Sequence, residues 1–342
     1  RTRRHLLRDR WADPLAGRDE REHEHHQADR CGDGDAGGTP GDRADALEPV
    51  GQASQHEDEE HRGQGLDRHL CEGEVGRPLE DEQARHRVAG QAEEQGRGEA
   101  SACRRRAERA GILFEQRTLP ATISPIEMTG IVQALNTDPR VTGIIIQRPV
   151  PKHLNIKELQ SAIHPLKDVE GMHPSSIGNI VYNDLTLGPC TAVAAVEILK
   201  TLPLKMEGLD VCVIGHSEIV GKPIAFLMMG LGATVTVCHH MTRQVAVHSR
   251  AADAVFVAVG KPGLVRGEML KPGAALIDIG INRVDGRTVG DADFASCAEV
   301  AGWITPVPGG VGPVTVAILM KNAVLATAMQ MDHYRTAFAA AV

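Results

Sequence analysis

The segment VIGHSEIVGKP, Val213–Pro223, has residue types and a spacing that could bind a phosphate group. An apolar run ends at Gly215, Ser217 follows, and Gly221 opens a helix-length segment. Small residues at such a turn let backbone N–H groups and a helix N-terminus approach a pyrophosphate. The spacing is not G-x-G-x-x-G, so a tight strand-to-helix connection with small residues for packing is the alternative.

The next apolar run ends in CHHMTR, and its residues bear on which dinucleotide would bind. A site that selects NAD often has an acidic residue here to bind the ribose 2′-hydroxyl, and none is present. The pattern favours NADP, whose 2′-phosphate could meet His239, His240 or Arg243. A histidine that is merely exposed or hydrogen-bonded at a strand end is the alternative.

Two further segments place polar residues beside apolar runs. In IIIQRPVPKH, Gln147 ends such a run, at the edge where open α/β sheets bind ligands, although a polar strand end facing water gives the same pattern. In HPLKDVEGMHP, Lys167, Asp168, Glu170 and His173 share one loop. Alone, that segment predicts a turn with solvated charges.

The loop TPVPGGVGPVT, Thr305–Thr315, contains so many glycines and prolines that its backbone must be unusual. Such a loop suits a place where backbone lies close to a flat ligand. A structural hinge before the last helix is the competing interpretation.

The chain beyond Gly111 has the elements needed to position these segments. Apolar runs alternate with helix-length segments, which is typical of an α/β domain with a parallel sheet. The last long apolar segment, Gly312–Met331, predicts an amphipathic to buried helix. The runs that predict buried strands are Val141–Gln147, Asp210–Gly215, Ala233–His239, Ala254–Gly260 and Ala274–Ile281.

The residues before Gly111 have a different composition from the rest. Residues 1–110 contain 19 Arg, no Lys, and no Ile, Phe, Met, Asn or Tyr, and with 26 Asp and Glu they carry nearly all of the net charge of -8. Their scattered apolar residues cannot form a core, which predicts a disordered segment. A native disordered tail is one account. The other is GC-rich DNA read in the wrong frame, because the missing residue types have codons rich in A and T.

Charge and cysteine content limit the classes of protein to which this chain could belong. A net charge of -8 gives no electrostatic reason to expect nucleic acid or an anionic membrane as a partner. We see no apolar run long enough for a membrane span and no signal-peptide pattern, so we expect a cytoplasmic protein. The seven cysteines include no C-x-x-C pair, which favours reduced, buried thiols. The segment HEHHQADRC, His23–Cys31, resembles a metal cluster only in composition, and we expect no metal there.

Together, about residues 107–331 resemble the bifunctional methylenetetrahydrofolate dehydrogenase/cyclohydrolase family. The matching segments, in the family's order and spacing, are NTDPRVTGIIIQRPVPKH, KDVEGMHP, GPCT, VIGHSEIVGKP, TVTVCH, VAVGKPG, IDIGINRV, VGDADF and ITPVPGGVGPVTVAILM. The resemblance implies oxidation of 5,10-methylenetetrahydrofolate with NADP, or NAD in some members, and hydrolysis of the methenyl product to 10-formyltetrahydrofolate. It also implies a homodimer.

The resemblance assigns roles to individual residues. Gln147 would pair with the family's catalytic lysine, and Glu170 would hold the pterin. The residues implied to bind the cofactor are Gly215, His216, Ser217, Gly221, His240 and Ile281. The residues implied to line the junction of nicotinamide and folate are Pro308, Gly309, Gly310, Val311 and Gly312.

This chain departs from the family's pattern at informative positions. Glu170 replaces a usual Asp, and His216 and His240 replace a frequent Arg and a usual Ser, both of which bear on the 2′-phosphate. Counting back from the family's Gly-Ile pair places its catalytic Lys at Cys103 and the accompanying Tyr at Glu99. Neither residue can substitute in the proton relay, so we expect the chain to lack cyclohydrolase activity and to be inactive or poorly folded.

The sequence therefore predicts three parts. Residues 1–110 are disordered or non-native, residues 111–190 are the remnant of a folate-binding α/β domain completed by helix 313–331, and residues 191–312 form a Rossmann-like NAD(P)-binding domain. Two other classes of function stay open. One is a catalytically dead NADP-binding or dimerisation module, and the other is a different NADP oxidoreductase with a new N-terminal domain.

Reading the gene in all three frames tests the account of residues 1–110. We expect another frame, before the Gly111 codon, to encode the alternating apolar pattern of a folded domain with the missing Tyr and Lys. A native tail would give no such pattern in any frame, and that result would reject the frameshift.

Overall fold

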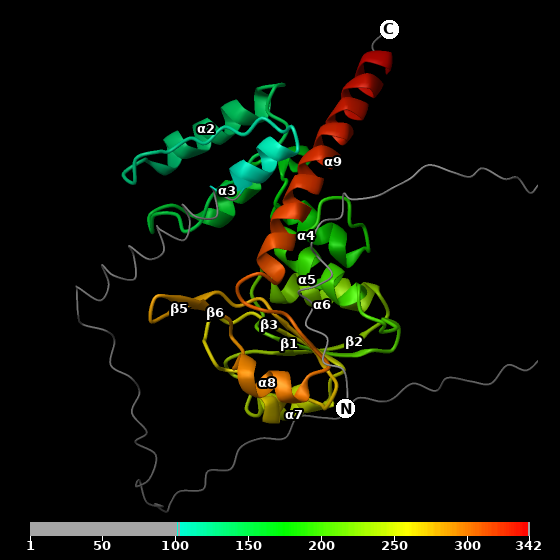
Figure 1. Ribbon diagram of the computed structural model, residues 1–342. Coiled ribbons are helices and arrows are strands. Elements are labelled where there is room, and N and C mark those ends of the chain that lie inside the picture. Colours follow the sequence, from blue (N-terminus) through cyan, green and yellow to red (C-terminus); the bar gives the residue numbers. More distant parts are fainter. Residues whose placement is uncertain (1–100, 102, 341–342) are drawn as a thin grey trace, which may run out of the picture. The chain divides into compact units, whose positions relative to one another are not determined.

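The computed structural model describes residue 101 and residues 103–340, all within one compact unit (Figure 1). Most of the segment expected to be disordered, residues 1–100, lies outside the described residues. The expectation is wrong for residues 103–109, which are helical. Ala107 is fully buried, and the Arg106 guanidinium donates to the carbonyl of Pro313. Packing against the C-terminal helix therefore orders this short segment.

The centre of the fold is a five-stranded parallel sheet, in the strand order β2-β1-β3-β4-β7. Four of the predicted strands appear here, each shortened because the residues after them leave the ladder as loops. The strands are β1 (Asp210–Ile214), β2 (Thr234–Cys238), β3 (Ala254–Val257), β4 (Ala275–Asp278) and β7 (Trp303–Ile304). The α/β fold class is thereby confirmed.

Helices cover both faces of this sheet (Figure 1). Alternate strand residues such as Phe256 and Ile277 face the core beside α5 (Cys190–Lys200) and α6 (Gly221–Gly230). Their neighbours in the strands, such as Val255 and Leu276, belong to a second core. That core includes residues of α8 (Phe294–Val300) and lies on the face where α7 (Val245–Ala251) packs. A strand buried on both faces is apolar at every position, which is why the sequence shows continuous runs here.

A two-stranded hairpin, β5 (Asn282–Val284) and β6 (Arg287–Val289), follows β4. Its turn consists of Asp285 and Gly286, both with positive φ, at 49° and 75°. Asp-Gly is a favoured pair for such a turn. The sequence analysis did not predict this hairpin.

The segment before the sheet is mainly helical. It contains α2 (Pro125–Thr137), α3 (Ile156–Ala162), the 3-10 helix η2 (Pro165–Lys167) and α4 (Pro174–Val181). The strand predicted at Val141–Gln147 is wrong for the described residues, where only an isolated bridge joins Ile144 to Asp168. A strand forms only where a neighbouring segment pairs with several of its residues. Among the described residues, Asp168 alone pairs with this segment.

The last helix, α9 (Val311–Ala340), is longer than predicted and connects the two regions. It packs along α5, and its buried Asn322 donates to the carbonyls of Val169 and Gly188 at 3.0 and 3.1 Å. Gln330 donates to the carbonyls of Thr142 and Leu166. By length and composition α9 could cross a membrane, which the sequence analysis did not foresee. Its buried polar anchors identify it as a helix of this fold.

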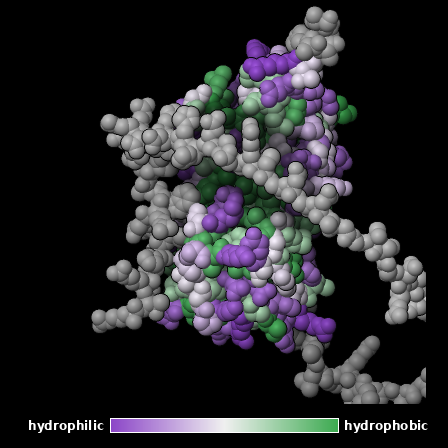
Figure 2. Space-filling view, turned by 90° about the vertical axis from the view of Figure 1, so that its right-hand side faces the viewer, coloured by the Kyte–Doolittle hydropathy of each residue, from purple (hydrophilic) through white to green (hydrophobic). Residues whose placement is uncertain are grey.

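Apolar side chains outside the sheet are incompletely covered. Leu113 is 98% exposed and Ile126 85%, and Val324 and Met331 of α9 are at least half exposed. Figure 2 shows apolar surface in a hollow across the middle of one face. Large apolar side chains are exposed in the sheet region as well, for example Met241 at 72% and Val247 at 56%, so this exposure alone does not mark missing packing.

Replacing Asn322 by alanine tests the anchoring role of α9. The variant removes the Asn322 donor from both carbonyls, although the Val169 carbonyl keeps the Cys190 thiol at 3.3 Å. We expect a loss of about 1–3 kcal/mol in the free energy of unfolding. Urea unfolding of the full chain measures this loss. The control is Thr336→Ala on the exposed end of the same helix, expected within about 0.5 kcal/mol of the parent. Equal midpoints for the two variants would contradict the anchoring role.

Candidate cofactor and substrate site

The carboxyl ends of the parallel strands form one edge, and the sequence-predicted cofactor residues follow those ends. Backbone pairing continues past β1 and β2, where the N–H of Gly215 donates to the carbonyl of Cys238 at 2.8 Å. Ile279 after β4 donates to Val257 in the same way. The residues that follow β2, β1, β3 and β4 are therefore held in that order along one edge, where open α/β sheets bind ligands.

The β1–α6 turn is tightly packed. Gly215 has φ +114°, and a Cβ added there would lie 2.3 Å from the carbonyl oxygen of Ala258. A Cβ on Gly221 would lie 1.9 Å from the carbonyl oxygen of Gly215. The Ser217 hydroxyl accepts from the N–H of Val220, and the Ser217 carbonyl accepts from the N–H of Lys222. Packing thus requires both glycines, and the turn uses some of its own N–H groups.

Two buried acids, Asp278 and Asp291, organise the neighbouring loops, and the sequence analysis missed their role. The Asp291 carboxylate accepts from the backbone N–H groups of residues 259, 260 and 261 at 2.6–3.0 Å, and from the Asn282 amide. Asp278 accepts from the N–H groups of residues 280, 291 and 292. Burial raises the pKa of Asp278. The sequence does contain a signal for this role. Asp278 lies within the apolar segment IDIG, and Asp291 lies in VGDADF.

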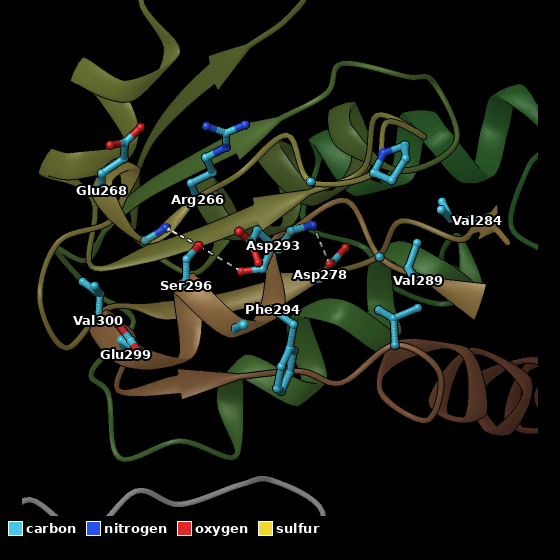
Figure 3. Close-up of a pocket in the computed structure, with 17 residues that line it drawn as sticks. Arg266, Glu268, Asp278, Val284, Val289, Asp293, Phe294, Ser296, Glu299 and Val300 are labelled. Atoms are coloured by element: carbon cyan, nitrogen blue, oxygen red, sulfur yellow. Dashed lines mark hydrogen bonds between the residues drawn. The ribbon is translucent and has the colours of Figure 1, made fainter. Parts of the chain in front are cut away.

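A cavity of about 980 Å³ lies beside these acids, and its labelled lining residues include Arg266, Phe294 and Ser296 (Figure 3). The hydroxyl of Ser296 accepts from the N–H of Gly267 at 3.1 Å. None of the sequence-predicted cofactor or substrate residues lines this cavity. The predicted chemistry is therefore not assigned to this cavity.

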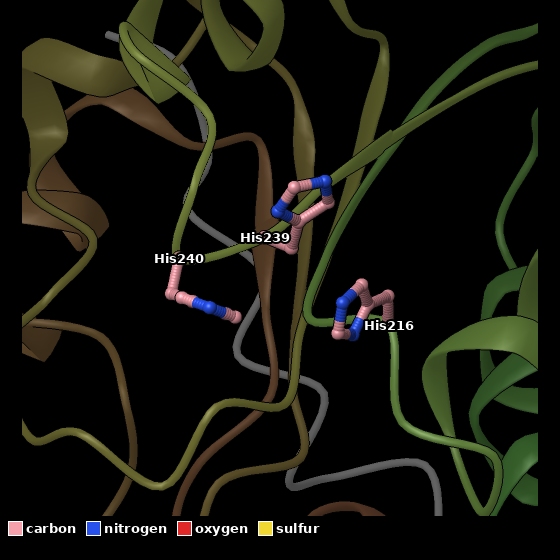
Figure 4. A group of neighbouring side chains, drawn as sticks. All are labelled: His216, His239 and His240. Carbon is pink, nitrogen blue, oxygen red and sulfur yellow. The ribbon is translucent and has the colours of Figure 1, made fainter.

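Three histidines converge at the ends of β1 and β2 (Figure 4). The ring of His216 lies 4.7 Å from that of His239 and 6.0 Å from that of His240, centroid to centroid. His216 and His240 are exposed and His239 is half-buried. The structure therefore brings together His216 and His240, which the resemblance places at the cofactor, and His239, which the sequence offered as a candidate for the 2′-phosphate.

The remaining cofactor and junction residues lie on the same edge. Ile281 follows β4 and is 48% exposed. The loop Pro308–Gly312 follows β7, and Thr305 before it accepts through its hydroxyl from the N–H of Asp278 at 2.8 Å. Gly309 has φ +104°, and a Cβ added to Gly309 or Gly312 would meet open space. Backbone at these two glycines is therefore accessible to a ligand.

The predicted substrate residues occupy the helical region. Gln147 is exposed, and its amide donates to the Arg148 carbonyl. The expected turn of solvated charges is wrong for Lys167 and Asp168, which are buried. Lys167 donates to the carbonyls of Leu135 and Asp138, and burial lowers its pKa. Asp168 accepts from the N–H groups of residues 172 and 173 and from the Ser176 hydroxyl. Glu170, which follows them, is half-buried.

Cys103, at the predicted lysine position, is partly buried against a small core that includes Cys190 and residues of α9. Burial raises the pKa of the Cys190 thiol, and Glu170 and Cys103 add to that rise. Cys103 and Glu170 thus share a neighbourhood. Glu99, the predicted tyrosine position, lies outside the described residues, as does His23–Cys31.

The other described cysteines are free, buried thiols, as predicted. The sulfurs of Cys212 and Cys238 lie 3.9 Å apart beneath the histidines. Burial raises the pKa of both thiols, and that of Cys297 to about 11. These cysteines are packing residues of the sheet.

Comparison with known proteins accounts for this arrangement. Residues 189–331 match the NAD(P)-binding domain of tetrahydrofolate dehydrogenase/cyclohydrolase, and residues 100–170 match the catalytic domain. The chain belongs to the tetrahydrofolate dehydrogenase/cyclohydrolase family. The match to the catalytic domain begins at residue 100, seven residues before the start expected from the sequence.

Relatives within the tetrahydrofolate dehydrogenase/cyclohydrolase family agree over the same part of the chain. Bifunctional protein FolD 2 of Mesorhizobium japonicum is 62% identical over 243 residues, which cover 70% of this chain and 79% of the relative. Bifunctional protein FolD of Moorella thermoacetica is 46% identical over 221 residues, 64% of this chain and 79% of the relative. About a fifth of each relative's length therefore lies outside the alignment with this chain.

Solved structures of the family share the fold. The bifunctional enzyme FolD, a methylenetetrahydrofolate dehydrogenase/cyclohydrolase from Campylobacter jejuni, is 36% identical with a TM-score of 0.67, covering 69% of this chain and 84% of that one. The Trypanosoma brucei enzyme, solved with NADP cofactor and an inhibitor, has the same identity, TM-score and coverage.

Replacing Gly221 by alanine tests the packing of the β1–α6 turn. Its Cβ would collide with the Gly215 carbonyl, and we expect a loss of about 1–3 kcal/mol or more in the free energy of unfolding. Gly130→Ala is the matched control, because its Cβ meets open space inside α2. It should be stabilising by about 0.5–1 kcal/mol. Urea unfolding of both variants gives the comparison, and a stable Gly221→Ala would contradict the close packing.

Proposed function

We propose that this chain binds NADP at the carboxyl edge of the sheet and, with its family, serves the oxidation of 5,10-methylenetetrahydrofolate to 5,10-methenyltetrahydrofolate. The observation that carries the proposal is the convergence of the β1, β2, β4 and β7 loops, with open backbone at Gly309 and Gly312. When bound, NADP supplies the hydride acceptor. The protein's task is to hold its nicotinamide beside the folate's one-carbon unit.

Individual residues would divide this binding task. The β1–α6 turn would position the phosphates with the N–H groups that it does not use itself, and Pro308–Gly312 would present backbone to the flat nicotinamide and pterin rings. Glu170 would hold the pterin and Gln147 would orient the reacting centre. The cofactor-binding residues in this proposal are Gly215, His216, Ser217, Gly221, His240 and Ile281.

Preference for NADP over NAD is supported by the charge of the β2 end. Residues 239–244 contain no acid that would repel a 2′-phosphate, and Arg243 is exposed among them. Imidazole N–H groups of His216 and His240 are further donors to such a phosphate. An NAD site would call for a carboxylate near this point.

The cyclohydrolase step is different, because the family's proton relay falls at Cys103. The neighbouring Arg104, Arg105 and Arg106 cannot replace the lysine, because a guanidinium does not release its proton near neutral pH. We therefore propose that the chain does not hydrolyse methenyltetrahydrofolate to 10-formyltetrahydrofolate.

A second candidate function is a catalytically dead NADP-binding or dimerisation module. The predicted replacement of the catalytic lysine by Cys103 favours it, because such a chain could bind the cofactor without completing the chemistry. In that case the dinucleotide site would form without a complete folate site.

The family's role suggests the cellular setting. We propose a cytoplasmic homodimer in one-carbon metabolism, supplying tetrahydrofolate interconversions used in purine, methionine and histidine biosynthesis. Its partners would be the folate and the cofactor, with neither nucleic acid nor membrane involved.

One preparation of the full chain tests both parts of the proposal. We expect NADPH to bind more tightly than NADH by fluorescence titration, and methenyltetrahydrofolate to disappear at the uncatalysed rate. Cofactor binding serves as the control that the dinucleotide domain is folded. Hydrolysis above the uncatalysed rate would reject the missing relay, and absence of any dinucleotide binding would reject the cofactor site. An assay of NADP-dependent oxidation of methylenetetrahydrofolate distinguishes the two candidate functions. Turnover supports the dehydrogenase, and cofactor binding without turnover supports the catalytically dead module.

A further inference from the structure

The three histidines at the ends of β1 and β2 have the arrangement of a metal-binding cluster. One ring nitrogen of each of His216, His239 and His240 lies within 4.8 Å of the other two. Figure 4 shows the side chains turned toward one another from two separate loops. A metal held by Zn–N bonds of about 2.0–2.1 Å brings such nitrogens to about 3.4 Å in tetrahedral geometry. The ring nitrogens therefore need to approach one another by at most about 1.4 Å, as estimated from those bond lengths.

The backbone beneath the rings is fixed, so the cluster does not depend on flexible loops. Ile214 pairs with Cys238 in the parallel ladder, and the N–H of Gly215 extends that pairing at 2.8 Å. His216 and His239 thus leave the sheet from neighbouring positions. The only movement required is rotation of exposed or half-exposed side chains, which costs little strain.

The hydrogen bonds of the three histidine rings show which contacts a bound metal would replace. The Nδ1 of His239 accepts from the N–H of Met241 at 3.1 Å. Whichever nitrogen of His239 turns to a metal, this hydrogen bond is lost, either directly or because the ring proton must move to Nδ1. Among the described residues, the rings of His216 and His240 make no hydrogen bond that coordination would disrupt.

The donor set selects the class of ion. Three imidazoles with no carboxylate among them suit Zn²⁺ and its neighbours Co²⁺, Ni²⁺ and Cu²⁺, whereas Mg²⁺ and Ca²⁺ require oxygen ligands. We propose that His216, His239 and His240 bind one transition-metal ion of this class, with a fourth position open to water. Three protein ligands and an open position are a common zinc arrangement.

This site would also couple metal to cofactor, a consequence that rests on the proposed function. The metal would occupy the ring nitrogens of His216 and His240 that we assign to the cofactor. Metal and NADP would then exclude each other, and saturating NADP would raise the apparent dissociation constant for the metal.

Titration of the full-length apo protein with Co²⁺ tests the site, because tetrahedral Co²⁺ has a distinctive visible absorption. Eight of the 16 histidines lie before Gly111 and would add background binding, so every sample carries His25→Gln and His26→Gln. In that parent we expect one tetrahedral Co²⁺, displaced by Zn²⁺. His216→Gln or His240→Gln should weaken binding by at least the roughly 10–100-fold seen for lost outer-shell partners.

The matched control is His248→Gln, an exposed histidine on α7 outside the cluster, which should leave the Co²⁺ titration unchanged. Equal titrations for the parent and the His240→Gln variant, with unchanged circular dichroism, would overturn the metal site. Repeating the titration with NADP present separates the two proposals. Unchanged Co²⁺ binding under saturating NADP would reject the cofactor's placement on these histidines and leave the metal site standing.

Discussion

The parallel pairing of β1 with β2 and β3 is the constraint on which the rest of the molecule depends. Parallel strands end at one edge, so the ladder carries Gly215, Cys238 and Ala258 to the same place and their loops must share it. Gly215 and Gly221 are needed because the backbone there approaches within contact distance of its neighbours. The three histidines meet for the same reason, although 23 residues separate His216 from His239 in the chain.

Buried polar groups hold the loops that the ladder brings together. Asp291 accepts from three consecutive N–H groups after β3, and Asp278 accepts from two consecutive N–H groups after the hairpin. In the helical region, Asn322 and Gln330 of α9 satisfy carbonyls of loops far away in sequence. Each such group is costly to bury without partners, so these contacts specify one arrangement of loops.

The two regions differ in their regular elements. Strands β3 and β4 of the sheet are fully buried between helices, whereas the described residues before the sheet form helices and an isolated bridge. This explains why no strand forms at the predicted position Val141–Gln147. The run is apolar enough for a strand, but among the described residues it pairs only through the bridge from Ile144 to Asp168. The proposed function therefore places the cofactor on the parallel sheet and the folate beside the helical region.

The sequence by itself determined the α/β class, four strands of the parallel sheet and the order of the family's segments, and it predicts that Cys103 stands at the position of the family's lysine. These are local properties, because a strand buried on both faces must be apolar throughout and a missing residue type is visible at once. Only the tertiary structure decided that Lys167 and Asp168 are buried, that Asp278 and Asp291 clamp backbone, and that His216, His239 and His240 form one cluster. Those properties depend on which distant segments become neighbours, and sequence spacing alone does not contain that information.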